Sequence, residues 1–461
     1  MNQTKHRSKG LLLTIIALAW PTMVEQLLQT AVQYVDTAMV GSLGTAATAA
    51  VGSTTTVNWL IGSTISAIGV GFLAFISKAH GAGEYDQAKR AAAQAVLAVL
   101  AVGLFFTVMT LSLSPVVPVW MQVDGEIRSL SAQYFFILYT PMLARTATII
   151  FGTVLRASGD TKTPMRIGIL VNLVNVVLNF LMIYPSRRIS IFSLKLWIPG
   201  AGMGVIGAAI ASAIAFAVGG ICITVALFRH PLISPRGYRL RPDKTILLPC
   251  LRVATPNACQ RFGTSLGYVV FAAMVNSLGG VATAAHTIAN TVESAFYIPG
   301  FGMQTAAATL AGNAYGARDE QRLKDLSKMI LALEIFLMIL SGTILFLLAP
   351  QMMSIFSKDA QVILLGATVL RMVAVSEPFY GTSIVIEGMM QGMGKTVMPL
   401  ICNVCGMWVI RIVGTFVFTQ IFDFGLVGAW ACMIAHNLAM FCMFATYYLS
   451  GRWNPMRSKK E

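Results

Sequence analysis

Twelve apolar segments, separated by short polar stretches, occupy most of this chain. They lie near residues 11–40, 46–77, 91–114, 130–156, 164–184, 202–228, 246–276, 281–312, 326–349, 361–392, 397–420 and 425–449. About 20 apolar residues are enough for an α-helix to cross a bilayer, and a helix pairs all of its own backbone groups there. Charged residues make up only 11% of the sequence, against about 25% in soluble domains. We therefore predict an all-α polytopic membrane protein with twelve transmembrane helices.

Several of these segments are longer than a bilayer requires, so we expect tilted or bent helices. A proline inside a helix removes a hydrogen bond and commonly bends it. The candidate bends are Pro21, Pro141, Pro256 and Pro378.

The positions of Lys and Arg predict the orientation of the chain. If the N-terminus is cytoplasmic, most of the 33 Lys and Arg fall in cytoplasmic segments and few in outer ones. This is the positive-inside pattern of membrane proteins, so the net charge of +15 does not indicate nucleic-acid binding. We expect a multi-pass protein of a bacterial inner membrane, with both termini in the cytoplasm.

An internal repeat divides the chain into two halves. MVGSLGTAATAA at 39–50 matches MVNSLGGVATAA at 274–285 in 9 of 12 positions, and Pro21 matches Pro256 at the same offset of 235. Because each half holds six spans, both insert the same way round, which implies a pseudo-two-fold axis along the membrane normal. We expect two six-helix bundles, an N-lobe at 1–228 and a C-lobe at 246–461, joined by a cytoplasmic linker at 229–245.

A polar stripe follows one side of the first span. It consists of Thr22, Glu25, Gln26, Gln29, Gln33, Asp36 and Thr37, and spacings of three and four residues place them on one helix face. An ionisable group at the membrane centre costs about 3 kcal/mol or more, so the stripe should face a protein interior or a water-filled cavity. In the second half, Gln260 replaces Glu25, Arg261 replaces Gln26 and Phe271 replaces Asp36.

Several motifs, taken in order, resemble the multidrug and toxic compound extrusion (MATE) family over essentially the whole chain. They are VDTAMVGSLG (35–44), GAGEYDQA (81–88), LRASGDTKTPM (155–165), NVVLN (175–179), GARDEQR (316–322) and MQGMGKTVMP (390–399). The resemblance implies a V-shaped transporter with a central cavity between two lobes, which expels organic cations in exchange for H⁺ or Na⁺. It implies neither an enzyme nor a cofactor other than the coupling ion.

The same resemblance places the ion-coupling residues in the first half. Asp36 corresponds to the family's coupling carboxylate, and Asn175, Asn179, Ser212 and Gln26 would complete its pocket. If the ion is Na⁺, Asp36 would be its ligand. The alternatives are a structural hydrogen bond for Asp36, helix-to-helix hydrogen bonds for the two Asn, and polar cavity lining for Gln26.

Substrate contacts are expected from Glu25, Gln29, Gln33 and Tyr139. Glu25 could bind a cation deeper in the cavity, or it could pair with an intramembrane arginine such as Arg145. Pro21 is the expected conformational hinge of the first helix.

The second half carries embedded charges of its own. They are Glu293, Glu334, Glu377, Arg261, Arg371 and Arg411. They could contact substrate or snorkel towards the membrane surface, but we expect internal ion pairs. Some relatives carry acids on the seventh and tenth helices. Here the aligned position on the seventh helix is Thr264, and Glu377 and Glu387 stand in a different register, which argues against a matching cation site.

Other classes of function find less support in the sequence. The GxGxxG pattern at 202–207 lacks the acid about 20 residues on that a dinucleotide site needs, so its glycines more plausibly allow close helix packing. The nearest rival is a lipid-linked oligosaccharide flippase of a related fold. An intramembrane lipid-modifying enzyme would need a nucleophile and base, and a channel would be more symmetric. The expected partners are small organic cations and the bilayer, with no nucleic acid, and we expect a monomer.

Overall fold

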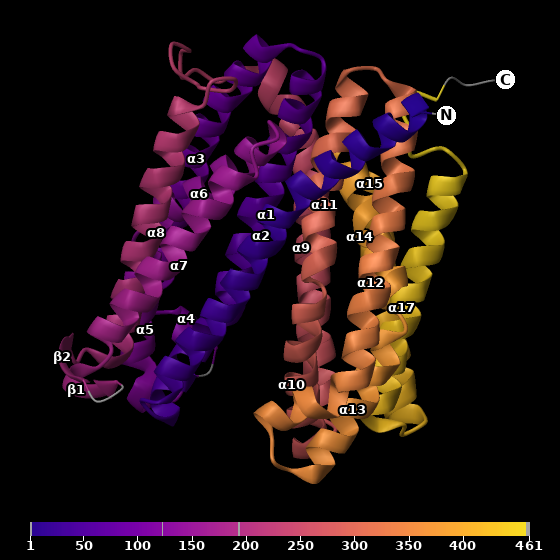
Figure 1. Ribbon diagram of the computed structural model, residues 1–461. Helices are drawn as coiled ribbons and strands as arrows, with labels where there is room; N and C mark the ends of the chain where they lie inside the picture. Colours follow the sequence, from indigo (N-terminus) through magenta and orange to yellow (C-terminus); the bar gives the residue numbers. More distant parts are fainter. Residues whose placement is uncertain (1, 122, 192–193, 458–461) are drawn as a thin grey trace. The chain divides into compact units, whose positions relative to one another are not determined.

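The computed structural model describes residues 2–121, 123–191 and 194–457, and its helices cover each of the twelve expected apolar segments (Figure 1). The first half comprises α1 (Asn2–Gly41), α2 (Thr45–Gly81), α3 (Tyr85–Leu113), α4 (Val117–Trp120), α5 (Gly125–Tyr139), α6 (Met142–Ala157), α7 (Lys162–Met182) and α8 (Gly204–Arg229). The second comprises α9 (Lys244–Asn276), α10 (Gly280–Phe296), α11 (Ile298–Gly316), α12 (Glu320–Phe356), α13 (Ala360–Ala374), α14 (Glu377–Gly392), α15 (Val397–Cys405), the π-helical η1 (Gly406–Ile412), α16 (Val413–Phe416), the π-helical η2 (Val417–Ile421) and α17 (Gly425–Leu449).

Length and composition alone qualify fewer of these helices as spans. Within the described residues, eight helices are long and apolar enough to cross a membrane, and ten spans result if two bent pairs each count as one. The bent pairs are α5 with α6, at 49°, and α13 with α14, at 54°. The remaining two of the twelve segments are α9, which contains Pro249 and Pro256, and the pair α10 and α11.

The four prolines behave in two ways. Pro141 lies at the break between α5 and α6, and Pro378 directly follows the break between α13 and α14. Pro21 and Pro256 instead lie inside helices that continue without a break. Two of the four predicted bends are therefore confirmed as breaks, while the hinge at Pro21 stays a prediction.

A short β-hairpin adds to the helical fold. β1 (Pro185–Ile191) and β2 (Leu194–Ala201) pair antiparallel, with Pro185 opposite Ala201 and Arg188 opposite Trp197. These strands form most of the loop that makes the first half longer than the second.

The chain forms two compact units, and their bounds differ from those of the repeat. Unit 1 contains residues 1–23, 73–84 and 248–461, and unit 2 contains residues 24–72 and 85–247. Helices α1 and α2 each contribute residues to both units. The linker expected at 229–245 belongs entirely to unit 2, and the lobe boundaries drawn from the repeat remain predictions.

Unit 2 is built around α8, which packs against α5, α6 and α7, while α3 packs against α6. Glycines allow α8 to approach closely. A Cβ added to Gly220 would lie 2.5 Å from the Cβ of Ala144, and one added to Gly207 would lie 2.5 Å from the carbonyl oxygen of Met182. Gly207 ends the GxGxxG pattern, so this glycine does serve helix packing.

Unit 1 is built around α14, which packs against α11, α12 and α17. A Cβ on Gly392 would lie only 1.8 Å from the carbonyl oxygen of Ala308, so α14 and α11 are in backbone contact. The N-terminal half of α1 joins this core, where Ile15 and Ala19 cluster with Met303 and Ala307.

Candidate functional site

In unit 2, Asp36 joins three of the four polar residues that the sequence assigned to its ion pocket. The fourth, Gln26, is half-buried on α1, and its place in the pocket stays a prediction. α1 supplies Asp36, α7 supplies Asn175 and Asn179, and α8 supplies Ser212. The Nδ2 of Asn179 donates to Oδ1 of Asp36 at 2.6 Å and to Oδ1 of Asn175 at 3.1 Å. Asn175 and Asn179 face the same side because they are one helical turn apart. The spacing of four thus predicted their pairing.

The Asn175 amide links Asp36 to Ser212. With its oxygen towards Asn179, its Nδ2 donates to Oγ of Ser212 at 3.0 Å. Turned by 180°, the nitrogen lies 2.9 and 3.1 Å from the two oxygens of Asp36, and the amide oxygen accepts from Ser212. Both orientations connect one carboxylate to neutral amides and a hydroxyl.

This group of residues has oxygen ligands to offer a small cation. Oδ1 of Asn179 is buried and has no hydrogen-bond partner among the described residues, and leaving such an atom unpaired is costly. Together with the Asp36 carboxylate and the Ser212 hydroxyl it forms an oxygen-rich set, the kind that hard cations prefer. The arrangement can therefore take up a proton on the carboxylate or a cation among the oxygens.

Glu25 pairs with an arginine, but not with the one that the sequence suggested. Nη2 of Arg156, at the end of α6, lies 2.7 and 2.6 Å from the two carboxylate oxygens of Glu25. Both side chains are mostly buried, with 18% and 21% of their surfaces exposed. Arg145, the partner named from the sequence, instead donates to Asn58 and lies over the rings of Tyr139 and Phe216.

The other residues that were expected to contact substrate differ in how deeply they are buried. Gln29 and Gln33 are exposed. Tyr139 is fully buried, and its hydroxyl donates to Oδ1 of Asn58 at 3.1 Å. Their assignment to substrate binding stays a prediction.

In unit 1, the repeat partner of Asp36 has the opposite chemistry. Phe271 occupies the position of Asp36 and is buried, and the guanidinium carbon of Arg411 lies 4.2 Å from the centre of its ring. Arg411 also lies over Tyr268, and its Nη2 contacts Sδ of Met433 at 3.0 Å. A buried guanidinium with aromatic and thioether neighbours repels cations, so this position is not a second copy of the Asp36 site.

The internal ion pairs expected in the second half are not formed. Among the described residues, none of the six embedded charges named above lies within 4.0 Å of an opposite charge. Neutral donors and acceptors take that place: Tyr297 donates to Glu293, and Arg261 donates to Asn257 at 2.9 Å. An ion pair forms only if two opposite charges on different helices lie close together. The position of a charge within its span does not predict which residues of another helix lie beside it.

Unit 1 nevertheless has an unusual feature, four buried carboxylates, which belong to Glu293, Glu334, Glu377 and Glu387. Glu387 accepts from Gln260 and Gln391 at 2.8 Å and from Asn403 at 3.1 Å. Glu334 and Glu377 are fully buried, and their carboxylate oxygens lack hydrogen-bond partners in the part of the chain that the structure describes. Burying an unpaired ionised carboxylate is very costly, so these acids are further candidates for proton binding.

Comparison with known proteins connects this arrangement to a family. The family model described as MatE matches residues 21–181 and again residues 256–417, so the two matches begin at the 235-residue offset of the internal repeat. The probable multidrug resistance protein NorM of Thermotoga maritima is 28% identical over 439 residues, covering 95% of this chain and 92% of its own. The probable multidrug resistance protein YoeA of Bacillus subtilis is 24% identical, covering 93% and 91%.

Solved structures agree in fold. A MOP superfamily transporter from Pyrococcus furiosus superposes with a TM-score of 0.86 at 24% identity, covering 97% of this chain and 96% of its own. A MATE protein in complex with MaD3S gives a TM-score of 0.87 at 23% identity, with 97% of each chain covered. These neighbours are two-lobe transporters with twelve helices, which agrees with the twelve helical segments found here.

The family model covers well over half of the chain, both halves match it, and the fold agrees over nearly the whole length. This chain therefore belongs to the multidrug and toxic compound extrusion family, whose members are membrane transporters and not enzymes.

Proposed function

We propose that this protein is a secondary active multidrug exporter that expels organic cations in exchange for H⁺ or Na⁺, with Asp36 as the coupling carboxylate. The observation that carries the proposal is the group formed by Asp36, Asn175, Asn179 and Ser212, which offers a single negative charge surrounded by neutral ligands. The names of the relatives in Thermotoga maritima and Bacillus subtilis support multidrug export as the activity.

Coupling would follow from competition for one negative charge. When Asp36 carries a proton or a sodium ion, the site is neutral, and it no longer attracts an organic cation. When the ion leaves, the charge returns and favours the cationic substrate. A ligand drives a conformational change only through its different affinities for the two states, and this competition provides such a difference.

The two amides would set how readily Asp36 exchanges its ion. The bond from Asn179 to Asp36 is charge-assisted, and hydrogen bonds to charged groups contribute about 1.5–3 kcal/mol. It stabilises the ionised carboxylate after the ion departs, and so opposes binding of the next proton.

The geometry favours a structural role for Glu25. Its charge is neutralised by Arg156, so this pair would position α1 against α6 and would not form the first contact with a cationic substrate. The orientation with cytoplasmic termini, the bacterial inner membrane as location and the monomeric state are parts of the same proposal.

Transport in proteoliposomes tests the assignment of Asp36. Ethidium efflux would be measured with an imposed pH gradient and with an imposed Na⁺ gradient, separately, for the wild type and for Asp36→Asn. We expect one of the two gradients to drive efflux in the wild type, and neither to do so in the variant. Asp124→Asn, which removes the same charge at an exposed position, should behave as wild type.

Two results would contradict the proposal. Ion-driven efflux by correctly folded Asp36→Asn would show that another group couples transport. Failure of the wild type to move any cationic dye under either gradient would favour a different substrate class, such as the lipid-linked oligosaccharides of a flippase.

A further inference from the structure

The end of α8 in unit 2 carries a shallow cavity that the proposed transport cycle does not use. It has a volume of about 290 Å³ and is lined by Thr224, Val225, Phe228, Arg229 and Arg236. Val225 and Phe228 form an apolar floor on the last turns of α8, and the neighbouring Thr224 donates its hydroxyl to the carbonyl oxygen of Gly220. The two arginines stand at its edge, one at the end of the helix and one in the loop that follows it.

An exposed apolar stripe leads along α8 to this cavity. Ile214, Ile221 and Val225 are exposed by 38%, 65% and 44% on a helix apolar enough to span a membrane. Their spacings of seven and four residues place them on one face, and Arg229 continues that face by another four. The stripe is therefore apolar over about three turns and basic at its end.

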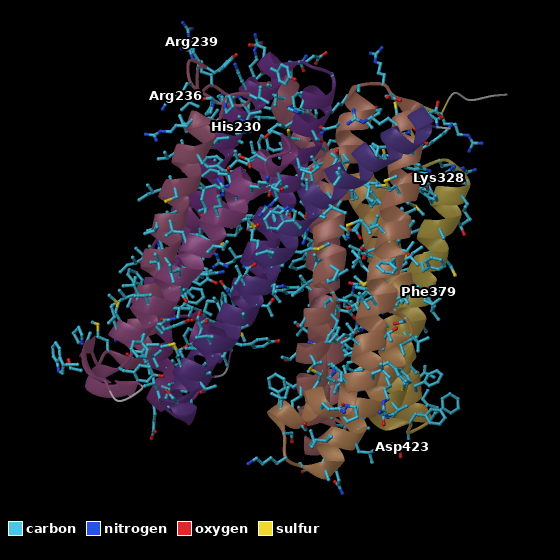
Figure 2. All side chains as sticks on the ribbon, in the orientation of Figure 1. His230, Arg236, Arg239, Lys328, Phe379 and Asp423 are labelled. Atoms are coloured by element: carbon cyan, nitrogen blue, oxygen red, sulfur yellow. The ribbon has the colours of Figure 1, made fainter. Side chains whose placement is uncertain are left out.

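The loop after α8 is fixed in a way that holds Arg236 beside Arg229. Ile233 and Pro235 are buried and anchor it. The hydroxyl of Ser234 donates to the carbonyl oxygen of Phe228 at 2.7 Å and accepts from the backbone nitrogen of Arg236 at 3.4 Å. This turn returns the chain to the end of α8, and Figure 2 shows Arg236 and Arg239 at that end of the unit.

The charge of this surface is strongly positive. Residues 229–245 contain five Arg and Lys and a single acid, Asp243. Hydrogen bonds from Thr245 hold the pKa of Asp243 below its usual range, so it remains ionised. Within the described residues, neither Arg229 nor Arg236 lies within 4.0 Å of a carboxylate, while the nearby His230 approaches Asp160 at 3.9 Å.

The carbonyl groups at the end of α8 would oppose an anion, because a helix C-terminus carries partial negative charge. Two of them are already occupied. The backbone nitrogen of His230 donates to the carbonyl oxygen of Leu227, and Ser234 donates to that of Phe228. The two guanidinium groups therefore dominate the local charge.

We propose that this cavity binds an anionic phospholipid, with its phosphate between Arg229 and Arg236 and an acyl chain along Ile221 and Val225. Guanidinium groups suit phosphate because they offer paired donors in a planar fork. A water-soluble anion would gain nothing from the apolar stripe, and a neutral lipid would leave both arginines without a counter-charge. Only an amphiphile with an anionic head group matches both parts of the site.

Native mass spectrometry of the purified full-length protein tests this proposal. Phosphatidylglycerol and phosphatidylcholine with the same acyl chains would be titrated into protein held in a neutral detergent. A basic residue near a membrane surface strengthens binding of anionic lipid about fivefold. We therefore expect R229Q/R236Q to weaken phosphatidylglycerol binding about 25-fold and to leave phosphatidylcholine binding unchanged.

A matched control separates this site from general surface charge. R239Q/K244Q removes the same charge from exposed positions of the same segment that do not line the cavity and should change phosphatidylglycerol binding far less than R229Q/R236Q does. Val225→Trp fills the cavity without changing any charge and should weaken binding as well. It also carries the test if R229Q/R236Q fails to fold.

The proposal would be overturned if both double variants lost binding equally, since the effect would then belong to overall charge. Equal binding of the two lipids by the wild type would also overturn it. Displacement of the lipid by millimolar inorganic phosphate, with no effect of Val225→Trp, would show an anion site that makes no use of the acyl chain.

Discussion

Replacing Glu25 by Gln should destabilise unit 2 by about 2 kcal/mol. The carboxylate lies 2.6–2.7 Å from Nη2 of Arg156, and both side chains are about four-fifths buried. Breaking a fully buried pair costs about 3–5 kcal/mol, because the remaining charge is left without compensation. An exposed pair contributes only about 0–1 kcal/mol. The partial burial of this pair places the expected cost between these limits.

A double-mutant cycle measures the interaction directly. Glu25→Gln and Arg156→Gln should each lower the free energy of unfolding by about 2 kcal/mol, while the double variant should lose little more than either single variant. The coupling energy is then about 1.5–2 kcal/mol. Reversible SDS denaturation followed by circular dichroism gives the free energies. Glu126→Gln, which removes an exposed carboxylate from α5, is the control.

Additive losses, with a coupling energy below about 0.5 kcal/mol, would refute this account of the pair. The cycle also distinguishes the two roles of Glu25. If Glu25 only positions helices, both single variants and the double variant should lose dye efflux to a similar extent, as they lose stability. Loss of efflux in Glu25→Gln and in the double variant, but not in Arg156→Gln, would return Glu25 to the substrate site, as the sequence first suggested.

Two further predictions concern packing and the linker. Gly207→Val should destabilise the protein by about 1–3 kcal/mol, because its Cβ would lie 2.5 Å from the carbonyl oxygen of Met182. A lowered melting temperature checks this, with Gly125→Ala, where a Cβ meets nothing within 4 Å, as the control; equal melting temperatures would contradict it. Gln94→Leu should expose residues 236–244 to trypsin, because Gln94 is buried and bonds the carbonyl oxygen of Arg241 at 2.8 Å and the backbone nitrogen of Asp243 at 3.0 Å. Limited proteolysis would show faster cleavage than in Gln133→Leu, an exposed change, and unchanged cleavage would count against this tie.

Patterns within single helices predicted most of the fold. The apolar segments gave the helices, because a helix in a bilayer must be apolar over a fixed length. The β-hairpin at 185–201 was missed as structure, although its alternating residues are typical of strands. Only two of the four prolines predicted to bend a helix lie at breaks, because a helix can continue through Pro21 or Pro256 when neighbouring groups compensate for the lost hydrogen bond.

The candidate site, like the fold, could be predicted from the sequence only in part. The group of Asp36 with Asn175 and Asn179 could be expected from helix spacing and family resemblance, since a turn of helix places residues four apart on one face. The partner of Glu25 could not, because several arginines occur in or near the spans, and only packing brings Arg156 and not Arg145 within reach. The same holds for Glu334 and Glu377, whose lack of partners depends on every helix around them.

The sequence by itself determined the class of protein, its internal repeat and the single acidic stripe on α1. Each of these follows from the hydropathy, the spacing or the self-similarity of contiguous residues. Only the tertiary structure decided which charges meet, which acids stay unpaired and where α8 presents arginines beside an apolar surface. Those outcomes depend on distances between residues that are far apart in the chain, and helix packing sets such distances through contacts that no local pattern records.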